Sequence, residues 1–402
     1  MNETITLCLE IIFWLALFIV FYTYLGYGIV LYVLVKLKEL FVKPVKRSLP
    51  ASDAGLPEVT LFITAFNEED VIDEKMENSL ELDYPADKLH IVWVTDGSND
   101  GTNERLKTRW QGKATIHFQP LRQGKTAAMT RGMTLVDTPL VVFTDANTMV
   151  NREAIQEIVL AFQDPKVGCV AGEKRIAVQT KDGAAAGGEG IYWKYESTLK
   201  ALDARLYSAV GAAGELFAVR RELFEAMEPD TLLDDFILSL RITMKGYTIA
   251  YCTNAYAIES GSADMREEEK RKVRIAAGGL QSIWRLRPLL NPFRYGTLSF
   301  QYTSHRVLRW SITPFLLFAL FPLNIAILLL GGSAIFYGVL LAMQVLFLRV
   351  GILGILSIHQ TDKKQVAFYP LLFPIYECQC AERHPLSEKE KRKRSLGKGK
   401  AR

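Results

Sequence analysis

Polar side chains follow three apolar segments of this 402-residue chain, at the points where the segments end. Asn67 and Glu68 follow the first segment, Asp96 ends the second, and Asp145 with Asn147 ends the third. Carboxylate and amide oxygens, together with phosphate oxygens, are the ligands that Mg²⁺ and Mn²⁺ prefer. The pattern therefore predicts a site in which a divalent cation, Mg²⁺ or Mn²⁺, bridges these side chains and the diphosphate of a nucleotide.

Two common phosphate-binding motifs are absent from the same region. A dinucleotide-binding fingerprint places Gly-x-Gly-x-x-Gly after the first strand, where this chain has NEED at residues 67–70. A P-loop needs a glycine five residues before the GKT of residues 124–126, and that position holds Gln119. Because neither glycine-rich loop is present, a metal ion is the expected carrier of the diphosphate.

Short apolar segments rich in β-branched residues alternate with helical stretches in the middle of the chain. This alternation is typical of βαβ units and predicts an α/β fold with a mostly parallel sheet. Ligands of such sheets bind beyond the carboxyl ends of the strands, which is where the polar residues lie. The predicted strands are 59–66, 89–96, 115–118 and 139–146, and the predicted helices include 67–80, 102–111 and 125–136.

Two long uncharged regions flank the predicted α/β domain. The first, Ile11 to Val35, has 25 residues and is long enough to cross the hydrocarbon core of a bilayer. The second, Trp310 to Leu348, has 39 residues and is broken by GGS at 331–333, so it fits two passes. Basic residues follow both regions, and the positive-inside rule then places the α/β domain and the C-terminal tail in the cytoplasm.

These patterns divide the chain into seven parts. We predict an N-terminal transmembrane anchor (1–38), a basic linker (39–56), a cytoplasmic α/β domain (57–280), an interfacial amphipathic segment (281–309), a two-helix transmembrane hairpin (310–358), a juxtamembrane or re-entrant segment (359–381) and a basic, disordered tail (382–402). The predicted location is a plasma (inner) membrane, with one N-terminal and two C-terminal transmembrane helices.

Composition excludes several other classes of protein. The net charge is +4, but residues 382–402 carry nine Lys and Arg against three Asp and Glu, so the rest of the chain is slightly acidic. We therefore expect no nucleic-acid partner. The five histidines lie far apart, as do the five cysteines apart from Cys378 and Cys380, which disfavours a zinc site or a disulfide scaffold.

Seven segments in the same order resemble the inverting family 2 glycosyltransferases, which have the GT-A fold. The flanking apolar regions are similar to those of membrane-embedded polysaccharide synthases of the hyaluronan, chitin, cellulose and poly-N-acetylglucosamine type. The segments are TAFNEEDVI (64–72), VTDGSNDGT (94–102), RQGKTAAM (122–129), VVFTDANT (141–148), SAVGAAGELFAVRREL (208–223), DTLLDDFILSLRITMKGY (230–247) and RKVRIAAGG (271–279).

The resemblance implies a role for each matching residue. Asp235 would be the catalytic base that deprotonates the acceptor hydroxyl, and Asp145 with Asn147 would bind the metal. The acceptor would lie beside Gly211, Gly214 and Asp234, where small residues allow close approach to the backbone. The implied nucleotide-sugar-binding residues are Asn67, Glu68, Asp96, Lys125, Asp145, Arg271 and Arg274.

One family motif is changed in this chain. Gln-x-x-Arg-Trp appears as RKVRI at 271–275, so only Arg274 is retained, and Ile275 replaces a Trp that helps processive members to hold the acceptor. Two structural alternatives remain open. Asp234 could be the N-cap of a helix over residues 235–245, and Arg271 with Arg274 could lie on a solvated helix face.

The implied function is transfer of a sugar from a UDP-sugar, with UDP-N-acetylglucosamine as the first expectation, to build a β-linked cell-surface polysaccharide. Single transfer to a polyprenyl phosphate or glycolipid is the alternative, and a non-catalytic membrane scaffold is a more distant one. The expected partners are the UDP-sugar, a glycan or lipid-linked acceptor and the lipid bilayer, with self-association or other polysaccharide-export subunits also expected.

Overall fold

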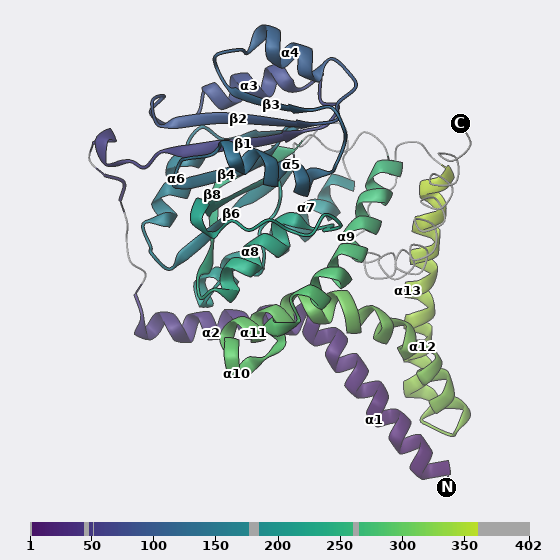
Figure 1. Ribbon diagram of the computed structural model, residues 1–402. Coiled ribbons are helices and arrows are strands. Elements are labelled where there is room, and N and C mark those ends of the chain that lie inside the picture. Colours follow the sequence, from purple (N-terminus) through teal and green to yellow (C-terminus); the bar gives the residue numbers. More distant parts are fainter. Residues whose placement is uncertain (1, 44–47, 51, 177–184, 260–264, 361–402) are drawn as a thin grey trace.

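The computed structural model describes residues 2–43, 48–50, 52–176, 185–259 and 265–360 (Figure 1). An eight-stranded sheet with helices on both faces forms one part of the molecule. Apolar helices from the two ends of the chain form the other part, at the lower right of Figure 1. The predicted α/β class is confirmed.

The sheet has the strand order β3-β2-β1-β4-β7-β6-β8-β5. Strands β3, β2, β1 and β4 are parallel, as predicted, and β6 is parallel to β8. Strand β7 runs antiparallel to β4 and β6, and β5 runs antiparallel to β8. The bounds are β1 Val59–Ala65, β2 Leu89–Asp96, β3 Thr115–Gln119, β4 Leu140–Asp145, β5 Thr148–Val150, β6 Val167–Ile176, β7 Leu216–Arg220 and β8 Thr248–Glu259.

Both faces of the central sheet are buried, because alternate residues of the inner strands enter different hydrophobic clusters. In β1, Leu61 and Ile63 pack on one face, and Phe62 packs on the other. Strands buried on both faces are typical of α/β proteins and explain the continuous apolar segments in the sequence. The covering helices are α3 Ile72–Leu80, α4 Thr102–Arg109, α5 Lys125–Gly132, α6 Ala154–Phe162, α7 Ala185–Leu206, α8 Asp234–Met244 and α9 Met265–Arg285.

The strand register brings the predicted site residues to one edge. Asp145 is paired with Thr64 of β1, and Thr95 is paired with Ala65. The residues after β1, β2 and β4 therefore lie side by side. The predicted helix over 67–80 is shorter than expected: α3 begins only at Ile72, because Asn67 has a left-handed backbone (φ 56°) that turns the chain after β1.

The N-terminal apolar region forms two helices that point in different directions in Figure 1. Helix α1 (Asn2–Phe21) and helix α2 (Tyr27–Phe41) are joined by a π-helix over Tyr22–Gly26. Helix α2 packs through Tyr27, Leu31 and Val35 on α7 of the α/β domain. The expected single span over residues 11–35 therefore contains a bend, where the π-helical segment interrupts the regular hydrogen-bond pattern.

The C-terminal apolar region forms α12 (Thr313–Leu329) and α13 (Ala334–Gln360), and α1 packs against both. Two continuous helical stretches, Glu3–Phe41 and Thr297–Leu329, are long and apolar enough to cross a membrane, and a shorter apolar stretch covers Ala334–Arg349. These are candidate spans by length and composition.

The predicted interfacial segment is helical and runs into the membrane candidate. It contains a 3₁₀ turn (Arg287–Leu290), α10 (Pro292–Tyr295), α11 (Thr297–Tyr302) and a π-helix (Thr303–Ile312) that continues into α12. The boundary expected between residues 309 and 310 therefore falls inside a continuous helix. Residues 361–402, which include the predicted tail and most of the re-entrant segment, lie outside the described residues.

Candidate active site

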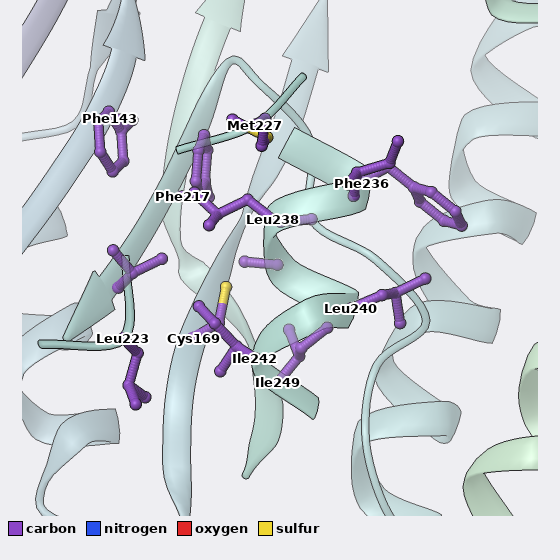
Figure 2. Close-up of a cluster of buried hydrophobic side chains, with 14 of the residues drawn as sticks. Phe143, Cys169, Phe217, Leu223, Met227, Phe236, Leu238, Leu240, Ile242 and Ile249 are labelled. Carbon is purple, nitrogen blue, oxygen red and sulfur yellow. The ribbon is translucent and has the colours of Figure 1, made fainter. Parts of the chain in front are cut away.

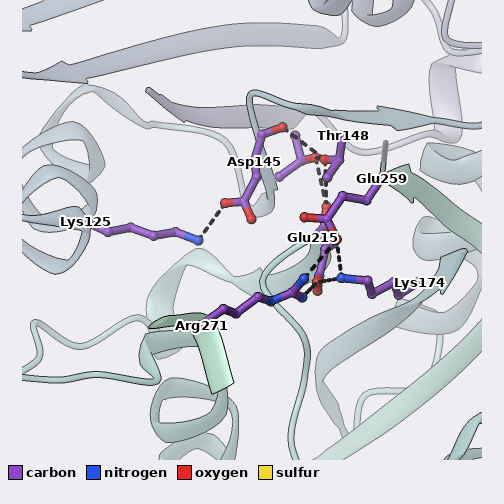
Figure 3. Close-up of polar contacts among 8 residues, drawn as sticks. Lys125, Asp145, Thr148, Lys174, Glu215, Glu259 and Arg271 are labelled. Carbon is purple, nitrogen blue, oxygen red and sulfur yellow. Dashed lines mark hydrogen bonds and ion pairs between the residues drawn. The ribbon is translucent and has the colours of Figure 1, made fainter. Parts of the chain in front are cut away.

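Lys125 and Asp145 form the ion pair at the centre of the sheet edge (Figure 3). Nζ of Lys125 donates to Oδ1 of Asp145 at 2.7 Å and lies 3.8 Å from Oδ2 of Asp234. Burial alone would lower the pKa of Lys125, but the nearby carboxylates of Asp145 and Asp234 raise it above its usual value. The predicted metal ligand Asp145 is therefore ion-paired with a protonated Lys125 in this structure.

Asp235 lies in the first turn of α8, beside this pair. The backbone N–H of Phe236 donates to Oδ1 of Asp235 at 2.8 Å. Burial, followed by the charge of Asp234, raises the pKa of Asp235 to about 7, although Lys125 opposes the rise. A carboxyl group that titrates near neutral pH is suited to general-base catalysis.

Helix α8 gives Asp235 a fixed position. All four of Phe236, Leu238, Leu240 and Ile242 are buried. Figure 2 shows Leu238 and Ile242 on the side of Phe217 and the sheet, and Phe236 and Leu240 on the other side of the helix, where the ring of Phe236 lies 5.0 Å from that of Trp310. A helix held by buried side chains on several sides has little freedom to move its first turn.

The N-cap interpretation of Asp234 is wrong. Helix α8 begins at Asp234, its N-cap is Leu233, and no side chain caps the helix. Oδ2 of Asp234 is buried without a hydrogen-bond donor in the described part of the chain, and Lys125 is its nearby cation. Asp234 therefore contributes negative charge to the site rather than a helix cap.

The two predicted acceptor-lining glycines have different surroundings. A Cβ on Gly214 would lie 3.2 Å from Nζ of Lys125 and 3.4 Å from Oδ2 of Asp235, so Gly214 borders the site directly. A Cβ on Gly211 would instead lie 2.2 Å from the ring of Phe236, and Gly211 has a positive φ of 89°. Gly211 therefore supports the start of α8, and its place beside an acceptor stays a prediction.

The turn that carries Asp145 rests on residues that the sequence did not single out. Nζ of the fully buried Lys75 donates to Oγ1 of Thr144 at 3.1 Å and to the carbonyl of Thr148 at 2.5 Å. Burial lowers the pKa of Lys75 to about 7. Thr144 also donates to the carbonyl oxygen of Glu215 at 2.9 Å. These hydrogen bonds hold the backbone of the turn after β4, and Asp145 is therefore fixed in position.

Arg271 lies in a compact cluster of four charged groups beside the turn (Figure 3). Its guanidinium contacts Glu215 at 3.1 Å and Glu259 at 3.4 Å. Lys174 donates to the same two carboxylates, at 2.5 Å to Glu215. Arg274, one turn further along α9, is exposed. The prediction of a solvated helix face is therefore met by Arg274 and not by Arg271.

Asp96 organises the loop that precedes Lys125. Its carboxylate accepts from the backbone N–H groups of Gln123 and Gly124 at 2.8 and 2.6 Å, and from Arg131 at 2.5 Å. Asp96 is only 4% exposed, so three donors already surround a buried carboxylate. A direct contact of Asp96 with a nucleoside stays a prediction.

Asn67 and Glu68 form the outer rim of the same edge. Asn67 exchanges two hydrogen bonds with Asn99, at 2.7 and 2.9 Å, which joins the loop after β1 to the loop after β2. Burial, followed by the charges of Asp145 and Asp100, raises the pKa of Glu68 to about 7. The structure thus brings Asn67, Glu68 and Asp145 to one edge, as predicted.

The chemistry of the oxygen donors permits a divalent cation at this edge. Asn147 is exposed two residues after Asp145, so one carboxylate and one amide are available. Within the described residues, no group of three or more His, Cys, Asp or Glu side chains is gathered around a metal position. These donors fit an ion that takes one or two protein ligands and completes its shell with phosphate and water.

An α/β sheet whose strands end in a group of acidic side chains is an arrangement found in enzymes. Residues 57–278 match the profile of a family described as "Glycosyltransferase like family 2". Because the match covers more than half of the chain, the chain belongs to this family of enzymes.

Two curated relatives match more than half of the chain. The chain is 26% identical over 236 residues to a poly-beta-1,6-N-acetyl-D-glucosamine synthase of Staphylococcus aureus, with 56% of each chain covered. It is 25% identical over 246 residues to the probable glycosyltransferase YdaM of Bacillus subtilis, covering 56% of this chain and 55% of that one. The match therefore spans about half the length of these curated relatives.

A solved structure shares the fold over nearly the whole chain. The mannosyltransferase PcManGT of Pyrobaculum calidifontis, in complex with GDP-Man and Mn²⁺, superimposes with a TM-score of 0.69 at 20% identity. The superposition covers 96% of this chain and 99% of that chain. At this identity, the likeness confirms the GT-A fold alone.

Proposed function

We propose that the protein is a membrane-bound, metal-dependent, inverting glycosyltransferase that takes a sugar from a UDP-sugar and builds a β-linked cell-surface polysaccharide. The observation that carries the proposal is the Asp235 carboxyl, with its pKa raised to about 7, beside the Lys125–Asp145 pair. UDP-N-acetylglucosamine is the first donor to test, because the poly-beta-1,6-N-acetyl-D-glucosamine synthase named above supports a donor of this kind.

In this proposal, the reaction needs one base and several cations. Asp235 accepts the proton of the acceptor hydroxyl as that oxygen attacks the anomeric carbon, on the face opposite the leaving UDP. Lys125 donates to the diphosphate and offsets its growing negative charge, and the exposed Arg274 adds a second cation. When bound to Asp145 and Asn147, Mg²⁺ or Mn²⁺ would supply Lewis-acid neutralisation of the same diphosphate.

The membrane part of the proposal is supported by the apolar helices. Helices α1, α12 and α13 pack on one another, and α2 connects them to α7 of the catalytic domain. We propose that this bundle crosses the plasma membrane, with the catalytic domain in the cytoplasm on the side of the basic residues that follow α2. The acceptor, a glycan or a lipid-linked glycan, would then reach Asp235 from the membrane side.

A second candidate function is single transfer to a polyprenyl phosphate or a glycolipid. Ile275 occupies the motif position at which processive family members have Trp. The described part of the chain also offers few membrane spans with which to enclose a growing polymer. Product size separates the two functions.

The test is UDP release by the detergent-purified full chain, with a panel of UDP-sugars and Mg²⁺ or Mn²⁺, followed by mass spectrometry of the products. Release with one donor, lost in Asp235→Asn, would support the transferase, and a ladder of products would support polymer synthesis. A single added sugar would favour the second candidate. Absence of both UDP binding and UDP release would contradict the proposal and favour a scaffold.

A further inference from the structure

Lys125 is the cation of a site that is otherwise rich in carboxylates. Its ammonium hydrogen-bonds Asp145 at 2.7 Å and lies 3.8 Å from Asp234. A Cβ placed on Gly214 would lie within 3.4 Å of both Nζ of Lys125 and Oδ2 of Asp235. Lys125 therefore faces the carboxylates of Asp145, Asp234 and Asp235, and its hydrogen bond goes to the predicted metal ligand Asp145.

A divalent cation that arrives alone would have to compete with this ammonium. Asp145 Oδ1 is already an acceptor for Lys125, and the exposed amide of Asn147 carries no charge. An ion placed on Asp145 would also be repelled by a positive charge a few ångströms away. Among the described residues, no group of three or more His, Cys, Asp or Glu side chains is placed to hold a metal ion. The site by itself is therefore a weak metal site.

A nucleoside diphosphate changes this balance because its oxygens serve both cations. One phosphate oxygen can accept from Lys125, which lies at the start of α5 and reaches the site through a flexible side chain. The freed carboxylate of Asp145 and another phosphate oxygen can then ligate the metal ion.

We infer that Lys125 makes divalent-cation binding conditional on the nucleotide, by occupying Asp145 until a diphosphate accepts its ammonium. This inference rests on the proposed donor site. The same exchange works in reverse: when UDP leaves, Lys125 returns to Asp145 and displaces the ion. Lys125 thereby couples capture of the metal to capture of the donor, and loss of the metal to release of the product.

The experiment measures Mn²⁺ binding, not turnover. The full chain in detergent is titrated with Mn²⁺, and the free ion is followed by electron paramagnetic resonance, with and without UDP. The variants are Lys125→Met, which removes the ammonium, and Lys125→Arg, which keeps the positive charge. Lys107→Met is the matched control, because Lys107 is an exposed lysine of α4 that lies over Phe118 and not in the site.

We expect the wild type and Lys107→Met to bind Mn²⁺ at least about tenfold more tightly with UDP than without it, which is the size of effect that one charge a few ångströms away produces. Lys125→Met should bind Mn²⁺ without UDP about tenfold more tightly than the wild type does, and Lys125→Arg should resemble the wild type.

Two results would overturn the inference. If wild-type protein binds Mn²⁺ equally well with and without UDP, Lys125 does not block metal binding at Asp145. That result would leave the proposed donor site unaffected. Unchanged nucleotide-free Mn²⁺ affinity in a folded Lys125→Met would have the same meaning. By contrast, Mn²⁺ binding in no condition, together with no UDP binding, would also remove the proposed function.

Discussion

Two clusters of acidic and basic side chains differ in how completely their charges are compensated. The first is the site cluster of Lys125, Asp145, Asp234 and Asp235. The second, which we call the junction cluster, lies where α7 meets the helices from both ends of the chain. It consists of Glu196, Asp203, His305, Arg306 and Arg309, all of which are buried except Arg306, which is partly buried.

Each acid of the junction cluster has more than one cationic or hydrogen-bonding partner. Glu196 lies 2.8 Å from both Arg306 and Arg309, and Asp203 accepts from Gln301 at 2.9 Å and contacts His305 at 2.5 Å. Burial alone would raise the pKa of Glu196, but Arg306, His305 and Arg309 hold it well below its usual range.

The acids of the site cluster are less completely compensated, since the ammonium of Lys125 is shared by Asp145 and Asp234. Burial therefore raises the pKa of Asp235 instead of being offset by cations. The comparison shows that charge compensation, and not burial, separates acids that hold the fold together from an acid prepared to accept a proton.

The largest expected effect follows from removing the base. Asp235→Asn should lower kcat by roughly 10²- to 10⁴-fold, because a positioned general base contributes about that much. UDP binding should persist, because the amide keeps the size of the side chain. Steady-state UDP release and UDP titration check both expectations. Asp137→Asn is the matched control, since the Asp137 side chain is 96% exposed and precedes β4, whose other end carries Asp145. Unchanged kcat in Asp235→Asn would remove Asp235 from the base role.

A substitution in the junction cluster should reduce stability, whereas Asp235→Asn should reduce activity. Glu196→Gln should lower the free energy of unfolding by roughly 3–5 kcal/mol, because Arg306 and Arg309 lose the buried negative charge that both contact. Asp235→Asn should cost little stability, since it removes an uncompensated buried charge. Denaturant or thermal unfolding of the two variants in the same detergent measures the difference, and equal losses of stability would end the distinction between the clusters.

The sequence predicted the strands and the acidic edge because both depend on local pattern. Apolar, β-branched segments end at Asp96 and Asp145, and parallel strands place such ends together. The sequence could not predict which acids are compensated. Arg271 meets Glu215 across 56 residues, and whether it faces that carboxylate or solvent depends on how α9 packs on the sheet.

The burial of Lys75 and the bend in the N-terminal helix were also not predicted, because both depend on packing between distant segments. Lys75 lies on the apolar face of α3, with Ile72 and Met76, and a lysine in that position is the one sequence signal that could have indicated a buried ammonium. The bend at Tyr22–Gly26 had no signal from Pro, and it follows from the packing of α2 on α7.

The pH dependence provides a sharper test of the comparison. Because Asp235 must be ionised to act as a base and its pKa is raised to about 7, kcat/KM should fall about tenfold for each pH unit below 7. Glu68 also has its pKa raised to about 7, so Glu68→Gln is the necessary control. If the acidic limb persists in Glu68→Gln, it belongs to Asp235, and if the limb disappears, Glu68 governs it.

The smallest expected effect comes from neutralising Glu215, whose carboxylate is paired with two cations and also acts on Asp235. Glu215 pairs with Lys174 and Arg271, and its negative charge also raises the pKa of Asp235. Glu215→Gln removes that charge and leaves both cations in place, so the acidic limb of kcat/KM should move to lower pH by roughly one unit or less. The carbonyl oxygen that accepts from Thr144 is unchanged by the substitution, so the turn carrying Asp145 should keep its position. A loss of rate at every pH without a shift of the limb would show that Glu215 acts through structure alone, and the pKa of Asp235 would then be set by burial and Asp234.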